Sequence, residues 1–94
     1  MAVSCAKVTD HAAETAVIGS VRRGPDPAPR AFIRLSKPDG EFMSEVECGP
    51  TGTFHMSVPP GDWRLICLVP RNRLEQELSL TRGDQYRVDF LLVA

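Results

Sequence analysis

The chain has 94 residues, of which 43% are hydrophobic and 24% are charged, and its formal net charge is −1. This length suits one small domain with one core, and the composition is too apolar and too balanced in charge for intrinsic disorder. Eleven basic residues are scattered among twelve acidic ones, so no broad positive field exists and we expect no nucleic-acid partner.

The first residues of the chain carry small and polar side chains with no period of 2 or 3.6. We therefore expect a flexible tail over residues 1–13, followed by a single domain over residues 14–94. No apolar run resembles a secretion signal or a membrane span, and three cysteines are an odd number that favours free thiols in a reducing compartment. We expect a cytoplasmic protein that does not bind a membrane.

From residue 14 onward, short apolar runs alternate with clusters of Gly, Pro, Asp and Asn about every ten residues. The predicted strands cover residues 15–21, 31–35, a run ending at 48, 54–58, 62–69, 74–80 and 86–93. No amphipathic helix of useful length appears. The pattern predicts an all-β fold, a seven-stranded antiparallel Greek-key β-sandwich of the prealbumin-like or Ig-like type.

The third and fourth predicted strands allow a register to be proposed, because residues directly opposite in an antiparallel pair share a face. A five-residue loop between them places Cys48 opposite Phe54 on the core face. The same register places His55 near Glu45 and Glu47 on the solvent face. We therefore predict a hairpin with one apolar and one polar side.

Several apolar side chains lie on faces that strand alternation assigns to solvent. They are Phe32, Ile66, Leu68, Leu91 and Val93. An exposed set of this kind marks an interaction surface, so we expect it to contact a protein partner or a second copy of the chain. The alternative is that the two sheets curl and bury both faces of the last strands.

The turns and strands between residues 14 and 65 resemble a known pattern. The segments that carry the likeness are Ala31–Leu35, Gly40–Phe42, Thr51–Phe54 and Pro60–Leu65. They resemble the carboxypeptidase regulatory-like, or prealbumin-like, sandwich and, more narrowly, the actinobacterial SseC-like family of unknown function. This resemblance implies a cytoplasmic accessory protein linked to sulfur metabolism, with a thiosulfate sulfurtransferase as a partner and no known catalytic residue.

The thiols are the first candidates for chemistry. Cys5 lies in the predicted tail with Lys7 two residues on, and an exposed thiol near a cation is a candidate nucleophile. Cys48 and Cys67 project inward by alternation, where a thiol behaves as a small hydrophobe. No CxxC or HxxxH spacing occurs, and we expect neither a metal nor a cofactor.

Two function classes follow. The first is a non-catalytic accessory or protein-binding module that presents a sheet face or an edge strand to a partner. The second is a sulfur acceptor that carries sulfur on Cys5. A third reading, an anionic-ligand site at one end of the sandwich, rests on arginines in turns, which are Arg22, Arg23, Arg30, Arg71, Arg73 and Arg82.

Overall fold

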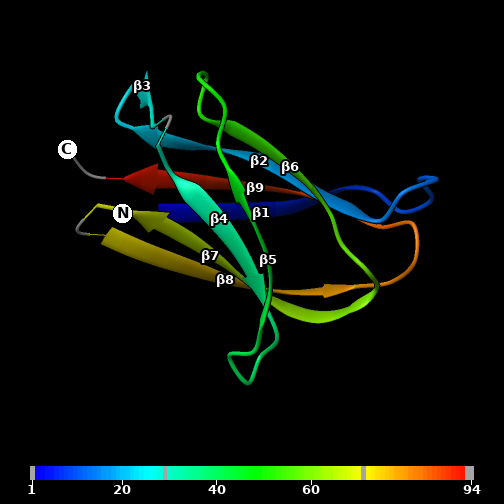
Figure 1. Cartoon of the computed structure of the whole chain (residues 1–94). Coiled ribbons are helices and arrows are strands. Elements are labelled where there is room, and N and C mark those ends of the chain that lie inside the picture. Colours follow the sequence, from blue (N-terminus) through cyan, green and yellow to red (C-terminus); the bar gives the residue numbers. More distant parts are fainter. Residues whose placement is uncertain (1, 29, 71, 93–94) are drawn as a thin grey trace.

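The computed structural model describes residues 2–28, 30–70 and 72–92 and contains strands and no helix in those ranges. The strands are β1 (Ala2–Thr9), β2 (Ala16–Arg23), β3 (Asp26–Pro27), β4 (Phe32–Ser36), β5 (Phe42–Glu47), β6 (Thr53–Ser57), β7 (Gly61–Val69), β8 (Asn72–Leu80) and β9 (Gln85–Leu92). They form two packed sheets (Figure 1). The predicted all-β sandwich is confirmed.

The first sheet has the order β1-β9-β2-β3, and β6 also pairs with β2. The second sheet has the order β5-β4-β7-β8. Every pair is antiparallel except β2 with β9, which run parallel. Parallel pairing is possible here because the chain between β2 and β9 passes through the second sheet before it returns.

The core lies between the two sheets and is built from the inward side chains of alternate residues. From the first sheet come Val17, Val21, Phe54, Met56, Val88 and Phe90, and from the second come Ile33, Leu35, Trp63, Leu65, Cys67, Leu78 and Leu80. The indole Nε1 of Trp63 donates to the carbonyl of Pro59 at 2.7 Å, which satisfies its polar atom at the edge of the core.

The predicted number of strands was too small, because the residues that the structure describes form nine strands rather than seven. One added strand is β1, which occupies residues expected to form a flexible tail. It pairs antiparallel with β9, from Ala2 opposite Leu91 to Thr9 opposite Gln85. An edge strand needs only one line of backbone partners, so β1 forms although Val3 is its one hydrophobic residue packed against the core. The other added strand is the two-residue β3.

The predicted hairpin of the third and fourth strands is wrong. The second of these strands, β6, pairs with β2 in the first sheet, whereas β5 pairs with β4 in the second. The amide of Cys48 donates to the carbonyl of Ala31, and the chain then crosses between the sheets through Gly49–Gly52. The predicted faces are nevertheless right, because a crossing between sheets keeps Cys48 and Phe54 pointing into the same core.

Candidate binding surface

The structure divides the five predicted interface residues between the two sheets. Phe32 and Leu68 are paired neighbours on the outer face of the second sheet, and the side chain of Phe32 is 39% exposed. Leu91, 46% exposed, lies on the outer face of the first sheet. Ile66 is buried, with 4% exposure, and Val93 lies outside the described residues. These residues therefore do not form one patch.

Ile66 is buried although it points outward, because charged side chains cover the outer face of the second sheet. It lies between Arg34 and Glu75 in the register of β4, β7 and β8. Arg34 pairs with Glu45 at 2.9 Å, and Arg64 pairs with Glu75 at 3.8 Å. The aliphatic stems of arginines held in this way cover apolar surface. This face therefore combines ion pairs with two exposed aromatic side chains, Phe32 and Phe42.

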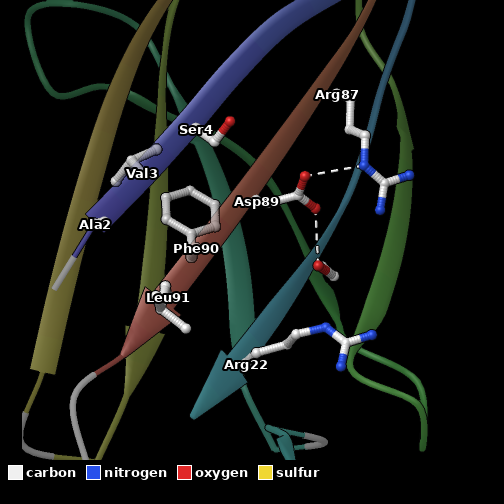
Figure 2. Close-up of a pocket in the computed structure, with 9 residues that line it drawn as sticks. Ala2, Val3, Ser4, Arg22, Arg87, Asp89, Phe90 and Leu91 are labelled. Atoms are coloured by element: carbon white, nitrogen blue, oxygen red, sulfur yellow. Dashed lines mark hydrogen bonds and ion pairs between the residues drawn. The ribbon is translucent and has the colours of Figure 1, made fainter. Parts of the chain in front are cut away.

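The outer face of the first sheet contains a hollow of about 340 Å³, formed by β1, β9 and β2 (Figure 2). It is lined by Ala2, Val3, Ser4, Ser20, Arg22, Arg87, Asp89, Phe90 and Leu91. The parallel pairing of β2 with β9 brings Ser20 opposite Asp89 and Arg22 opposite Leu91. Small residues of β1 leave the space open on the other side.

Two side chains that line the hollow donate hydrogen bonds to the carboxylate of Asp89. Ser20 Oγ donates to Asp89 Oδ1 at 2.8 Å, and Arg87 Nε donates to Asp89 Oδ2 at 2.9 Å. Figure 2 shows both interactions as dashed lines, with Arg22 outside them. The Nη1 of Arg22 donates to the carbonyl of Pro25 at 3.4 Å. Arg22 forms no ion pair within the described ranges.

The thiols differ in exposure, as predicted for Cys48 and Cys67, which are buried. Burial raises the pKa of Cys48 to about 11, with Glu47 adding to the effect, and raises that of Cys67 to about 12, with Cys48 adding to it. Cys5 is exposed on β1, yet partial burial also raises its pKa. Lys7, the predicted cation beside Cys5, has Asp84 as an ion-pair partner, with Nζ 3.6 Å from Oδ1.

Residues 2–92 match the model of a family described as Protein of unknown function (DUF1416). The chain belongs to this family. No curated protein matches the chain. The family's match begins in β1, so the first strand lies within the region that DUF1416 proteins share, whereas the resemblance noted from the turns began only near residue 14.

The histidine on the outer face of β6 has a different neighbour from the predicted ones. His55 Nε2 lies 3.2 Å from Glu14, whereas Glu45 and Glu47 belong to the other sheet. Among the described residues of this DUF1416 protein, no group of three or more His, Cys, Asp or Glu side chains could hold a metal ion. No helix in those same ranges is long and apolar enough to cross a membrane.

The arginines gather mostly at one end of the sandwich. Arg23 and Arg30 line a second hollow of about 280 Å³ together with Asp26, Pro27, Ala28, Ala31, Val69 and Pro70. Arg22 and Arg73 lie in the strands that end or begin here, and the same end holds the start of β1 and the end of β9 (Figure 1). Arg82 lies in the turn before β9, at the opposite end, and Arg71 is outside the described residues.

The residues of the first hollow were not predicted as a set. Ser20 and Asp89 are 69 positions apart, and alternation assigns faces to strands without assigning neighbours. Ser4 and Ala2 belong to a strand that the sequence pattern did not reveal. Leu91 was the one signal, since an apolar residue at an outward position of the last strand pointed to this face.

Proposed function

We propose that this protein is a non-catalytic, protein-binding module that docks a partner on the outer face of β1, β9 and β2. The hollow beside the exposed Leu91 carries this proposal. A surface with an apolar side chain, small neighbours and a rim of polar groups is typical of protein interfaces. On the outer face of the second sheet, the exposed Phe32 and Phe42 lie among the ion pairs of Arg34 and Arg64, and no hollow beside them combines an apolar side chain with small neighbours in the described residues.

The groups that a catalyst needs do not converge on this face within the described ranges. The Ser20 hydroxyl donates to a carboxylate and has no imidazole beside it, and His55 Nε2 lies 3.2 Å from Glu14 Oε1 instead. The raised pKa of each thiol favours the less nucleophilic thiol form at neutral pH. These arrangements support binding rather than group transfer.

We further infer that the module belongs with the SseC-like proteins of the carboxypeptidase regulatory-like, prealbumin-like group. The two-sheet sandwich supports this grouping, as do the turn segments that carry the resemblance. The resemblance implies an actinobacterial accessory protein of sulfur metabolism. Three cysteines without a disulfide support a cytoplasmic location.

Affinity capture with matched variants tests the docking face. Leu91→Glu places a charge beside the hollow, and Phe42→Glu places the same charge on β5 of the other sheet, where Phe42 is also exposed. We expect a partner that wild type and Phe42→Glu retain and Leu91→Glu loses, with circular dichroism showing that all three fold. Equal capture by the two variants would assign the partner to another surface.

A second proposed function is sulfur acceptance by Cys5, favoured because Cys5 is the exposed thiol of the three. In this step the Cys5 thiolate attacks the outer sulfur of a sulfurtransferase persulfide. A new S–S bond forms on Cys5, and the enzyme leaves as its thiolate, so no external oxidant is required.

Intact mass after incubation with a sulfurtransferase and thiosulfate should then show one added sulfur atom. Cys5→Ala should abolish the addition, whereas Cys48→Ala should keep it, because Cys48 is buried. No addition to wild type, or the same addition to Cys5→Ala, would exclude this role.

A further inference from the structure

We propose that the hollow between β1, β9 and β2 selects an acidic segment of its partner, with Arg22 binding a carboxylate and Leu91 packing against an adjacent apolar side chain. This inference rests on the proposed docking face and adds the chemistry of the partner. Figure 2 shows the side chains that would meet such a segment.

The charges inside the hollow leave Arg22 as the group available to a ligand. Both oxygens of Asp89 are occupied, one by Ser20 at 2.8 Å and the other by Arg87 at 2.9 Å. Asp89 and Arg87 therefore neutralise each other. Arg22 is exposed, and its one described contact is the 3.4 Å hydrogen bond to the Pro25 carbonyl. One guanidinium thus remains with most of its donors free to bind a carboxylate in a bidentate geometry.

The apolar half of the proposed site is fixed by strand register. Arg22 lies directly opposite Leu91, and Leu91 lies directly opposite Ala2. All three side chains share the outer face, because residues opposite each other in a sheet point the same way. A segment with a carboxylate on Arg22 has the apolar side chain of Leu91, 46% exposed, directly beside it for an aliphatic group to contact. An acidic residue next to an aliphatic residue matches this row.

The surroundings favour the same ligand charge. Arg23 and Arg30 line the second hollow at this end of the sandwich, and Asp26 is the acidic residue on that lining. The chain as a whole carries a formal charge of −1. An end enriched in arginine on a nearly neutral protein steers acidic segments toward Arg22 and away from the rest of the surface.

Binding of two model peptides to the full chain tests the inference by NMR. The probes are acetyl-Val-Glu-Val-Glu-Val-amide and acetyl-Val-Gln-Val-Gln-Val-amide, which differ in charge and little in shape. We expect the acidic peptide to shift the backbone amides of Ser4, Arg22 and Leu91, and to bind at least about tenfold more tightly than its amide counterpart. Added salt should reduce that preference, since the ion pair is near the surface.

Two variants with the same change in charge locate the effect. Arg22→Gln should abolish the preference for the acidic peptide, whereas Arg82→Gln, at the opposite end of the sandwich, should keep it. Equal binding of the two peptides, a preference that survives Arg22→Gln, or shifts confined to the hollow near Arg30 would each overturn the inference. None of these results would decide whether the outer face of β1, β9 and β2 is the docking face. That question is decided by the affinity capture that compares Leu91→Glu with Phe42→Glu.

Discussion

Gly19 lies on β2 where this strand runs between β9 and β6 in the first sheet. It is paired with Val88 of β9 on one side and with Phe54 of β6 on the other. A Cβ atom built at this position would lie 1.7 Å from the carbonyl oxygen of Val88 and 3.0 Å from the Phe54 ring. Because the first of these atoms belongs to the backbone, a side chain at residue 19 would force β2 and β9 apart.

Gly19→Ala should therefore destabilise the protein by about 3 kcal/mol or more, or prevent folding. Gly49→Ala is the matched control, because a Cβ there would meet only the Thr53 carbonyl oxygen at 3.9 Å. Urea unfolding of the two variants measures the difference. Similar midpoints for the two variants would mean that β2 and β9 do not approach as closely as the structure has them.

The buried thiols should make the fold sensitive to alkali. Burial raises the pKa of Cys48 to about 11 and that of Cys67 to about 12, against about 8.5 for an unfolded cysteine. A folded pKa above the unfolded value stabilises the fold fully below about pH 8.5, and this contribution is lost as the pH rises toward the folded values. We expect the urea midpoint to fall over this window. The urea midpoint should fall less steeply with pH in a Cys48→Ala, Cys67→Ala double variant. Equal slopes in wild type and the double variant would contradict the assignment of this alkali sensitivity to the two buried thiols.

At the scale of elements, alternation and turn residues predicted seven of the nine strands. Inward residues of these runs lie in the core, and Cys67 and Phe90 are examples. The β1 strand was missed because its small side chains follow no period and its pairing is with β9, at the other end of the chain. The sequence wrongly predicted that β5 pairs with β6. A hairpin and a crossing between the two sheets would bury the same side chains, so the hydrophobic pattern does not distinguish these two connections. Faces are encoded locally, whereas neighbours depend on the whole chain.

Strand alternation predicted the exposure of an outward side chain correctly only where that one strand determines it. Phe32 and Leu91 are exposed, as alternation indicated. Ile66 is buried between Arg34 of β4 and Glu75 of β8, and these two neighbouring strands could not be assigned from the sequence. The pair of Ser20 with Asp89 required the parallel contact of β2 with β9, which no local pattern signals.

The turn before β9 fixes the far end of β1. The Asp84 carboxylate accepts hydrogen bonds from the backbone amide and the hydroxyl of Thr81, at 2.8 and 2.9 Å, and lies 3.6 Å from Lys7 Nζ of β1. The backbone hydrogen bond from Thr81 is the main cause that lowers the pKa of Asp84, and Lys7 contributes.

Protonation of Asp84 should therefore lower the free energy of unfolding in acid. A folded pKa below the unfolded value stabilises the fold above the unfolded value of about 4, and the contribution disappears as the pH falls through the folded pKa. We expect wild type to lose stability below about pH 4 more steeply than Asp84→Asn, measured by urea midpoints across acid pH. Hydrogen exchange should show the loss first in β1, whose end is held by Lys7. Parallel pH profiles would contradict this role.

At the scale of the whole molecule, the four edge strands of the sandwich are unequally protected against pairing with a strand of another molecule. Among the described edges, β8 carries Arg73, Glu75 and Glu77, β5 carries Glu45 and Glu47, and β6 has five residues. The eight residues of β1 include one charge, that of Lys7, which is directed to Asp84. Val8 adds an apolar side chain that is 52% exposed. An edge of this length, whose one charge is paired within the chain, is a template for another strand.

Two copies of the chain should therefore pair through β1 when no partner is present. Antiparallel pairing of two β1 strands is self-complementary, and it meets no like-charge repulsion because Lys7 is already held by Asp84. Light scattering after size exclusion should give a mass that rises with concentration in the micromolar range. Ala6→Lys, which puts a charge on the exposed edge, should give a monomer throughout, whereas Thr51→Lys in the loop before β6 should behave as wild type. A wild type that stays monomeric, or a dimer that Ala6→Lys leaves intact, would place the contact elsewhere.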